Sequence, residues 1–421
     1  MMYLDSLDNG LITELVDMLG RLNPVEIVTP ANANEIKPKW IENVIKQRAF
    51  VNPSFHYDRE YLSNIASYHS RLITIKSHLE QNVIPESCAE RILLDILSTR
   101  IEQGIKATEL AVSILFQNDV CTSEISQSIY GAPTPAQITE CYRAVGNTTS
   151  SKPRFTESER AKLKAMSFGA EEIRYWFARS LDFYRISPSD WTIEVGDQYT
   201  AIDVRAINST GHPVVGIPTN RKVNGLKLLE LIGHEIACHL IGVENARHLF
   251  LELLGEDSPL APLALILAKS SDELLDEGRA KHSDVAISGT NAMPSPYYSI
   301  AISLARQGCA FRYVAEEIFN IRIATGSSIE TAARLSWTNT YRVFRGSTRP
   351  GSSEGYAFTK DFIYYAGYDI VKNINPIYLD YASMSIDELE ALFSVLDMST
   401  LKCKYPNLDI VAYIKDELLS K

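Results

Sequence analysis

Cysteine is scarce in this sequence, and the few cysteines do not occur in metal-binding or redox pairs. The 421 residues include six, none of them in a C-x-x-C arrangement, at positions 88, 121, 141, 238, 309 and 403. Small secreted domains depend on closely spaced disulfides, and cysteine zinc sites need paired thiolates. Both classes are excluded, and we expect a reducing, cytoplasmic location.

Blocks of basic residues and long apolar runs are also missing. The net charge is -11, so nucleic acid is not expected as a partner. The most apolar stretch, LAPLALILA at 260–268, is too short to cross a bilayer. The first residues include acids and lack the basic-then-apolar order of a secretory signal. No association with a membrane is therefore expected.

The order of helix and strand patterns predicts an α+β protein that is mainly α. Apolar residues recur at helical spacing through most of residues 58–116, and Thr156 and Glu159 form a capping-box pattern at the start of another helix. Three β-branched segments predict a small antiparallel sheet, at 191–195, 199–207 and 213–218. Helical patterns return after residue 224.

The helix that follows these strands contains two histidines and a glutamate in a very apolar setting. In LLELIGHEIACHLIG, at 228–242, His234 and Glu235 are followed by His239. The usual zinc-peptidase spelling H-E-x-x-H places its histidines four residues apart, on one face of an α-helix. Five residues span about 140° round a regular helix, so both imidazoles could face one ion only across a π-type turn. The pattern therefore predicts an i→i+5 turn within residues 234–239.

Two interpretations of this cluster are open. A histidine on an apolar helix is commonly a hydrogen-bonded core residue, whereas a metal would satisfy both imidazoles and the carboxylate together. A catalytic zinc takes three protein ligands. The segment SSDELLDEGRAKHSD offers Glu273, Asp276, Glu277 and Asp284 as the third ligand. Glu277 stands out because Gly278, a costly residue inside a helix unless close packing requires it, follows directly.

Several ordered blocks resemble one family of metallopeptidases. HEIACH and DEGRA, followed by YRVFRG at 341–346, FTKD at 358–361 and YYAGY, resemble the HExxxH zinc peptidases. That family includes the microtubule-associated tyrosine carboxypeptidases and their bacterial QEGLA-motif relatives. NPSFHY at 52–57 and SIYGAP at 128–133 resemble its N-terminal blocks. The resemblance covers roughly residues 45–400.

The resemblance implies a zincin-like fold and a complete zinc site. His234, His239 and Glu277 would bind Zn²⁺, and Glu235 would act as the general base for a zinc-activated water. Ala237 and Cys238 replace the family's usual Gly-Thr, Asp276 stands where Glu or Gln is usual, and Arg279 replaces Leu. These departures leave the ligands unchanged and affect only their surroundings.

The sequence also suggests how the chain is divided, with the loop at 145–157 as the best candidate linker. We expect an N-terminal helical extension at 1–44, a helical region at 45–150 and a metallopeptidase core at 151–421, which could pack as one globular unit. Within the core, the sheet is expected at about 190–218, the HExxxH helix at about 224–241 and the third-ligand helix at about 270–282. A helical part completes the C-terminus.

A carboxypeptidase must also bind a free C-terminal carboxylate, and arginine does this best through its two-pronged guanidinium. Arg342, Arg345 and Lys360 are the candidates. In the alternative interpretation they form structural ion pairs with acids such as Asp361. The last predicted strand, PVVGIP, could be a sheet edge that pairs with an extended substrate.

The function expected from these features is zinc-dependent removal of the C-terminal residue of a protein or peptide, with Tyr or Phe favoured by the resemblance. An aminopeptidase or endopeptidase is one alternative. A regulatory or binding protein on the same fold is another, although such a protein would be expected to have lost a ligand or the base. Tubulin is not expected as the substrate, because its acidic tails would meet a chain of charge -11 that has no basic extension.

Overall fold

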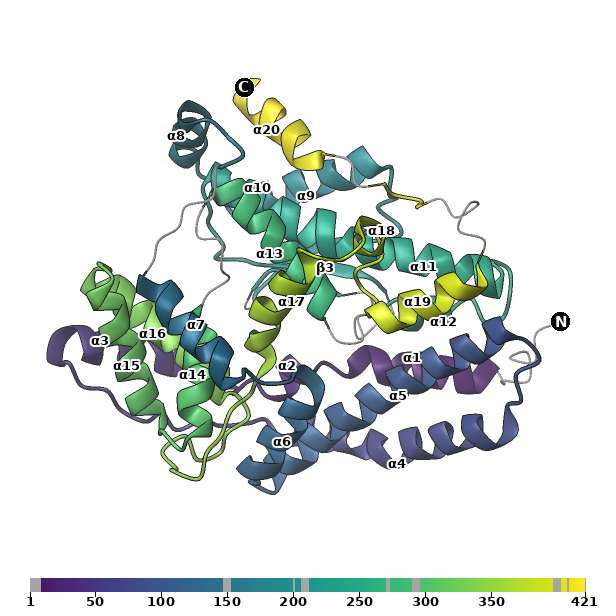
Figure 1. Cartoon of the computed structure of the whole chain (residues 1–421), viewed down its shortest axis with the longest axis horizontal. Helices are drawn as coiled ribbons and strands as arrows, with labels where there is room; N and C mark the ends of the chain where they lie inside the picture. Colours follow the sequence, from purple (N-terminus) through teal and green to yellow (C-terminus); the bar gives the residue numbers. More distant parts are fainter. Residues whose placement is uncertain are drawn as a thin grey trace.

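The computed structural model describes residues 9–146, 153–199, 201–205, 212–269, 273–289, 296–396, 403–406 and 409–420. Helices dominate, and one small sheet lies among them (Figure 1). The predicted fold class, α+β and mainly α, is confirmed.

The first third of the chain contributes seven helices within the described residues: α1 (Asn9–Arg21), α2 (Pro24–Ile27), α3 (Ala33–Gln47), α4 (Arg59–Asn82), α5 (Cys88–Leu115), α6 (Asp119–Tyr130) and α7 (Pro135–Gly146). The long helices α4 and α5 lie side by side, with α1 packed along them (Figure 1). A capping box begins α5, where the Ser87 hydroxyl accepts from the Glu90 amide and the Glu90 carboxylate accepts from the Ser87 amide.

The middle of the chain contains α8 (Glu157–Ala165), α9 (Ala170–Tyr184), β1 (Thr192–Gly196), β2 (Asp203–Arg205) and β3 (Val214–Pro218). The predicted capping box of Thr156 and Glu159 begins α8. The helix after the strands is divided into α10 (Gly225–Leu231), a π-helical stretch η2 (Ile232–Leu240) and α11 (Ile241–Leu254). Then come α12 (Leu263–Leu267) and α13 (Leu274–Ser288).

The last third contains α14 (Pro296–Arg306), α15 (Phe311–Ala324), α16 (Ile329–Phe344), the 3₁₀ turn η3 (Lys360–Phe362), α17 (Ile363–Val371), α18 (Pro376–Leu379), α19 (Ile386–Val395) and α20 (Ile410–Ser420). Helix α3 packs against α16, where the rings of Trp40 and Trp337 lie 5.2 Å apart. Segments from the two ends of the chain therefore share one part of the core. The division at residues 44 and 150 stays a prediction.

The sheet is mixed, which corrects the prediction of an antiparallel one. Its order is β1-β3-β2, with β1 parallel to β3 and β2 antiparallel to it. Short loops between the predicted strands favoured hairpins, but the 17 residues between β1 and β3 are long enough for a crossover. Because β3 is paired on both sides, it cannot be the edge that takes up an extended substrate, as the sequence suggested.

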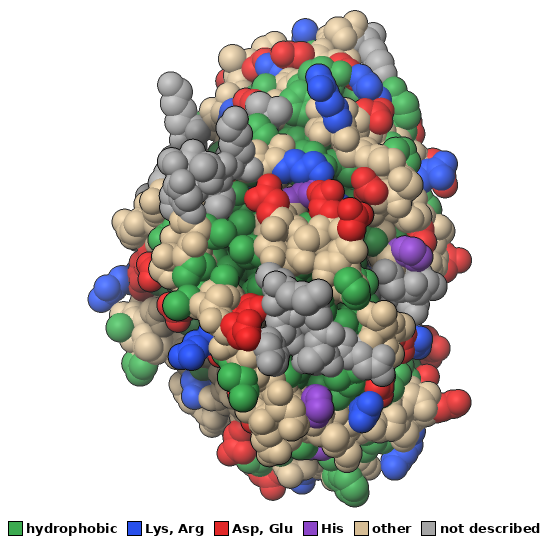
Figure 2. Space-filling view, turned by 90° about the vertical axis from the view of Figure 1, so that its right-hand side faces the viewer, with side chains coloured by type: hydrophobic (Ala, Val, Ile, Leu, Met, Phe, Trp, Pro, Cys, Tyr) green, Lys and Arg blue, Asp and Glu red, His purple; other side chains and the backbone are tan. Residues whose placement is uncertain are grey.

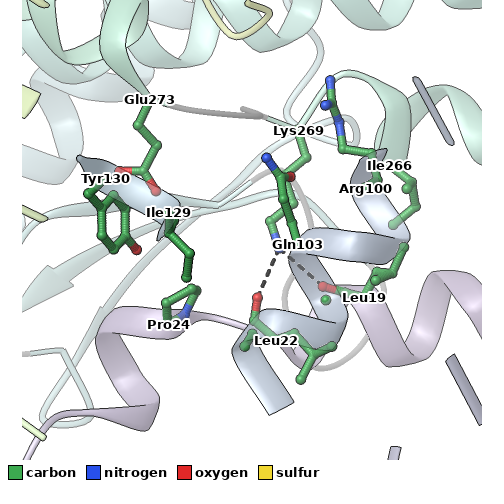
Figure 3. A pocket seen from close by; sticks show the side chains of 12 residues that line it. Leu19, Leu22, Pro24, Arg100, Gln103, Ile129, Tyr130, Ile266, Lys269 and Glu273 are labelled. Atoms are coloured by element: carbon green, nitrogen blue, oxygen red, sulfur yellow. Dashed lines mark hydrogen bonds between the residues drawn. The ribbon is translucent and has the colours of Figure 1, made fainter. Parts of the chain in front are cut away.

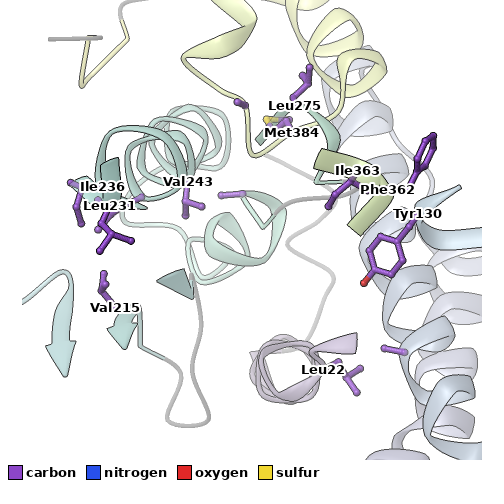
Figure 4. Packing of buried hydrophobic residues seen from close by; sticks show 14 of the residues in the cluster. Leu22, Tyr130, Val215, Leu231, Ile236, Val243, Leu275, Phe362, Ile363 and Met384 are labelled. Atoms are coloured by element: carbon purple, nitrogen blue, oxygen red, sulfur yellow. The ribbon is translucent and has the colours of Figure 1, made fainter. Parts of the chain in front are cut away.

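The predicted π-type turn is confirmed and lies inside a longer helix than expected. Asn224 caps the start, where its side-chain oxygen accepts from the Lys227 amide at 2.8 Å. The helical path then runs through η2 and on to Leu254, beyond the predicted end near residue 241. Its apolar face covers the sheet, and Figure 4 shows Leu231 and Ile236 above Val215 of β3.

Helices α13 and α17 approach each other through a pair of glycines. A methyl group on Gly278 would lie 2.3 Å from the carbonyl oxygen of Gly367, and one on Gly367 would lie 2.0 Å from that of Leu274. On its other side α13 packs on η2, where a methyl group on Gly233 would meet Ser283 Oγ at 2.4 Å. The glycine after Glu277 is therefore explained by close packing, as its place in the sequence suggested.

The distribution of charged side chains on the outer surface agrees with the lack of basic blocks in the sequence. On the face drawn in Figure 2, basic side chains lie mostly singly among acidic and polar ones. All six cysteines are free thiols. Among the described residues, no helix is both long enough and apolar enough to cross a membrane.

We expect Gly278→Ala to lower the free energy of unfolding by about 1–3 kcal/mol, because a backbone carbonyl cannot move aside for the new methyl group. Gly242→Ala is the matched control, since it also lies inside a helix but its methyl group would come no closer than 3.5 Å to any neighbour. That variant should gain up to about 1 kcal/mol from helix propensity. Urea unfolding of both variants measures the difference, and equal stabilities would contradict the close-packing account.

Candidate metal centre

The π-helical stretch brings the two histidines of the motif to one side of the helix. The rings of His234 and His239 lie 4.8 Å apart, nearly edge to face. Their Nε2 atoms lie 3.7 Å and 3.8 Å from the same carboxylate oxygen, Oε2 of Glu277 on α13. Three potential ligand atoms from two helices therefore converge on one point.

A separate carboxylate orients each imidazole from behind. Nδ1 of His239 lies 2.8 Å from Oδ2 of Asp276, and Nδ1 of His234 lies 3.2 Å from Oδ2 of Asp284. A hydrogen bond from Nδ1 fixes the tautomer that leaves Nε2 as the free, metal-binding nitrogen. Both histidines are therefore turned toward Glu277 by acids on α13 itself.

The described residues fit a zinc ion. Oε2 of Glu277 is buried and has no hydrogen-bond partner, although it faces two imidazole nitrogens. Ligands at about 2.0–2.1 Å in tetrahedral geometry are about 3.3 Å apart, only slightly closer than the distances here. Glu235 also offers an oxygen near the histidines, since atoms of His234, Glu235 and His239 lie within 4.8 Å of one another. Two imidazoles and a carboxylate are a donor set that zinc prefers.

The charges around this point call for a cation. Glu235, Glu273, Asp276, Glu277 and Asp284 are buried or half-buried there. Lys360 pairs with Glu273 and Glu277, and Lys281 pairs with Asp284. One oxygen each of Asp276, Glu277 and Asp284 is buried without a hydrogen-bond partner. A divalent ion would offset most of this unfavourable charge.

Coupling among the protein groups shifts their pKa values strongly. Burial tends to raise the pKa of Glu277, but Lys360 and the two histidines outweigh it and lower that pKa to about 2. Burial opposes a charge on His239, yet Asp276, at hydrogen-bond distance, helps raise the pKa of this histidine to about 10. Burial raises the pKa of Glu235. A metal that binds Nε2 of His239 would therefore displace the proton that the charged imidazole holds on that nitrogen, while the Nδ1 hydrogen bond to Asp276 remains.

The three basic residues predicted to bind a terminal carboxylate differ in their surroundings. Lys360 is buried and lies 2.6 Å from Glu273 and 3.4 Å from Glu277. Lys360 is therefore linked to the metal centre by its ion pairs with Glu273 and Glu277. The other two are the arginines that face Asp361.

Arg342 and Arg345 share the buried carboxylate of Asp361, at 2.5 Å and 3.6 Å. The side chain of Arg342 is 28% exposed and that of Arg345 only 7%. Arg342 also donates to the hydroxyls of Tyr298 and Tyr364, at 3.3 Å and 3.1 Å. The ion pairs considered as an alternative are thus present, and of the two arginines Arg342 is the one more open to solvent.

A buried acid from the N-terminal helices anchors the loop that follows Arg345. Asp119, at the start of α6, accepts from the Ser347 hydroxyl at 2.7 Å and from the amides of Thr348 and Arg349 at 2.9 Å and 3.1 Å. These bonds fix the end of α16, which contains Arg342. No sequence pattern indicates this long-range contact, because the partners are more than 220 residues apart.

Sequence reasoning missed some roles on α13. The sequence offers Asp276 and Asp284 as metal ligands, whereas in the structure each lies at Nδ1 of a histidine and orients it. Lys281 was not considered, yet its Nζ lies 2.9 Å from Asp284 and 5.0 Å from the ring centre of Tyr364. Helical spacing was the available signal, because Glu273, Glu277, Lys281 and Asp284 recur every three or four residues on one face.

Comparison with known proteins finds one family. Residues 300–395 match the model of the family described as microtubule-associated tyrosine carboxypeptidase. The match runs from within α14 to the end of α19, and includes Arg342, Arg345 and Lys360 but not His234, His239 or Glu277. Neither curated proteins nor solved structures provide a match. This match, to less than half of the chain, supports the family predicted from the sequence blocks.

We expect Asp276→Asn to weaken zinc binding about 10–100-fold, because the amide cannot hold the His239 tautomer as a carboxylate does. Competition with a chelator of known zinc affinity measures this effect. Asp369→Asn is the matched control, because its side chain is 73% exposed on α17 and pairs only with Lys372 among the described residues. Unchanged zinc affinity in the Asp276 variant would show that the acid does not orient a ligand.

Proposed function

We propose that this chain belongs to the family of microtubule-associated tyrosine carboxypeptidases and is a zinc-dependent carboxypeptidase. It removes the C-terminal residue of a protein or peptide. The observation that carries this proposal is the convergence of the His234 and His239 Nε2 atoms on Oε2 of Glu277. The family match adds the reaction class, since its description names a carboxypeptidase.

In this proposal His234, His239 and Glu277 hold the ion, and Glu235 is the general base. When bound, Zn²⁺ would supply Lewis-acid polarisation of the scissile carbonyl and a lower pKa for water. Glu235, next to His234 on the same stretch of helix, accepts the proton of the attacking water and returns it to the leaving amine. Asp276 and Asp284 keep both imidazoles in the tautomer that binds metal.

Recognition of the terminal carboxylate is assigned first to Arg342. Its side chain is 28% exposed, and its guanidinium is already held in place by Asp361 and two tyrosine hydroxyls. A fixed, planar fork loses little entropy when it binds a carboxylate. Lys360 and Arg345 stay predicted contributors, but Arg345 is buried against Asp361 and Lys360 is held by Glu273 and Glu277.

The preferred terminal residue is proposed to be Tyr, which the description of the family names, or Phe, which the sequence resemblance also favours. The same description names microtubules, so the prediction that tubulin is not the substrate rests on the net charge of -11 alone. It stays a prediction, as does a cytoplasmic location. Peptides that differ only at the C-terminus separate these questions from the reaction itself.

The first test compares wild type with Glu235→Gln, which should bind one zinc per chain but lose at least about 10²-fold in rate, because the base is missing. Mass spectrometry follows loss of one residue from N-acetylated peptides ending in Tyr, Phe or Ala. Glu252→Gln, an exposed position on α11, is the matched control and should keep full activity. Cleavage of a C-terminally amidated peptide would point instead to an endopeptidase.

We expect Arg342→Lys to weaken binding of a peptide with a free C-terminus about 10–100-fold, because lysine cannot form the two parallel hydrogen bonds. Binding is measured by calorimetry in the Glu235→Gln background, where no peptide is consumed. The amidated peptide should bind equally with either residue at position 342. Arg349→Lys, at an exposed ion pair with Glu354, serves as control. The assignment is wrong if Arg342→Lys leaves the preference for acid over amide intact.

A further inference from the structure

A cavity lies beside the candidate metal centre, between the N-terminal helices and the middle of the chain. About 590 Å³ of empty space lies within it, a volume that includes space open to solvent. Figure 3 shows Glu273 and Tyr130 on one side and Lys269 on the other, with Pro24 and Leu22 along the lower edge. Most of the lining is apolar, and the polar groups are few and separate.

The N-terminal helices form one wall of this cavity. Leu19 lies at the end of α1, and Leu22 and Pro24 lead into α2. Lys269 fixes this wall, because its ammonium donates to the carbonyl oxygens of Leu19 and Leu22 at 3.1 Å and 3.0 Å. These carbonyls would otherwise lie unsatisfied at the end of a helix. The segment ahead of residue 45, which the sequence resemblance does not cover, therefore lines the same cavity as Tyr130 of the SIYGAP block.

A short chain of charged side chains links the cavity to the metal centre. Glu273, which lines the cavity, lies 2.6 Å from Lys360, and Lys360 lies 3.4 Å from Glu277. Glu273 has a φ of 57°, in the left-handed region. Backbone strain of this kind is concentrated at functional sites, and here it places a carboxylate between the cavity and a proposed zinc ligand. A residue bound next to Glu277 is thus within a side chain's length of the cavity.

The polar groups of the cavity include donors that lack acceptors. Tyr130 is 5% exposed, its ring packs edge to face on Phe358 at 5.6 Å, and its hydroxyl has no hydrogen-bond partner among the described residues. A buried hydroxyl without a partner is costly and calls for an explanation. The ammonium of Lys269 has three donors, of which two are used by Leu19 and Leu22. A ligand with an apolar body and one hydroxyl would satisfy this arrangement.

We propose that this cavity receives the side chain of the substrate's terminal residue, and that its Tyr130 hydroxyl selects a phenol over a phenyl ring. This inference rests on the proposed carboxypeptidase function. Apolar side chains from α1, α5 and α6 surround the ring, and Tyr130 hydrogen-bonds the phenolic oxygen of a terminal tyrosine. The N-terminal helices are then a wall of the specificity pocket and not a cover that must leave before substrate binds.

The experiment measures binding and trimming of peptides that end in Tyr, Phe or Ala, with two variants of the cavity. Tyr130→Phe removes only the hydroxyl and keeps the ring on Phe358. It should lower the preference for Tyr over Phe about five- to tenfold, the effect of one hydrogen bond. Its melting temperature should equal or exceed that of wild type, because a buried group without a partner is removed. Tyr175→Phe, at an exposed tyrosine on α9, is the matched control.

The second variant, Ala107→Leu, fills the cavity from α5, where Ala107 is fully buried in the lining. It should weaken binding of peptides ending in Tyr or Phe at least about tenfold and leave Ala-ended peptides unchanged. Ile129→Ala, which enlarges the cavity from α6, tests the same wall in the opposite direction if the leucine variant does not fold. It should improve binding of a peptide ending in Trp relative to one ending in Tyr.

Binding is measured by calorimetry in the Glu235→Gln background, so the cavity is tested apart from the chemistry. A wild type that binds Tyr-ended peptides but trims none would contradict the proposed function. The role of the cavity would still be tested by peptide binding to its variants. If neither cavity variant changes the preference among peptides that end in Tyr, Phe or Ala, the inference is wrong. Trimming of these peptides by wild type would still support the proposed carboxypeptidase function. A wild type that binds Tyr- and Phe-ended peptides equally would overturn the role of the Tyr130 hydroxyl.

Discussion

The candidate site depends on one geometric constraint, the five-residue spacing between His234 and His239. A regular α-helix would point these side chains about 140° apart, and no rotamer choice brings both to one small ion from such directions. The π-helical stretch Ile232–Leu240 removes the conflict by widening the helix where the motif lies. Everything else at the site, from the orienting acids to the position of Glu277, is arranged around the side of the helix that this widening creates.

Helix α13 is the second organising element, and its contacts explain its sequence. Glycines at 278 and 367 let α17 approach until backbone meets backbone, and Gly233 lets α13 settle on the π-helical stretch. This close packing holds the α13 acids within reach of both histidines. One helix thereby supplies a proposed ligand in Glu277 and the two carboxylates that fix the imidazoles. Substitutions in the glycine contact and at the orienting acids should thus affect the same geometry by different routes.

The acids around the centre also explain the positions of the basic residues. Lys281 and Lys360 each pair with acids of α13, and Arg342 and Arg345 share Asp361. For Arg342, Arg345 and Lys360, the sequence is compatible with both structural ion pairs and substrate binding. The structure brings the two interpretations together, because a basic side chain held by a buried acid is also fixed in place for a substrate carboxylate. Of the two arginines, Arg342 is the more exposed and is therefore the better candidate to bind that carboxylate.

The sequence alone determined the local features of this protein. The histidine spacing required a π-type turn, Thr156 and Glu159 predicted a helix start, Gly278 indicated a close contact, and ordered blocks indicated the family. These signals survive in a single sequence because each depends on residues a few positions apart. The tertiary structure decided what depends on distant partners: the mixed sheet with β3 at its centre, the carboxylates behind each imidazole, the Asp119 anchor, and the α1–α2 wall of the cavity. Spacing along the chain cannot reveal such contacts, because packing and burial, and not local helix or strand preference, bring those residues together.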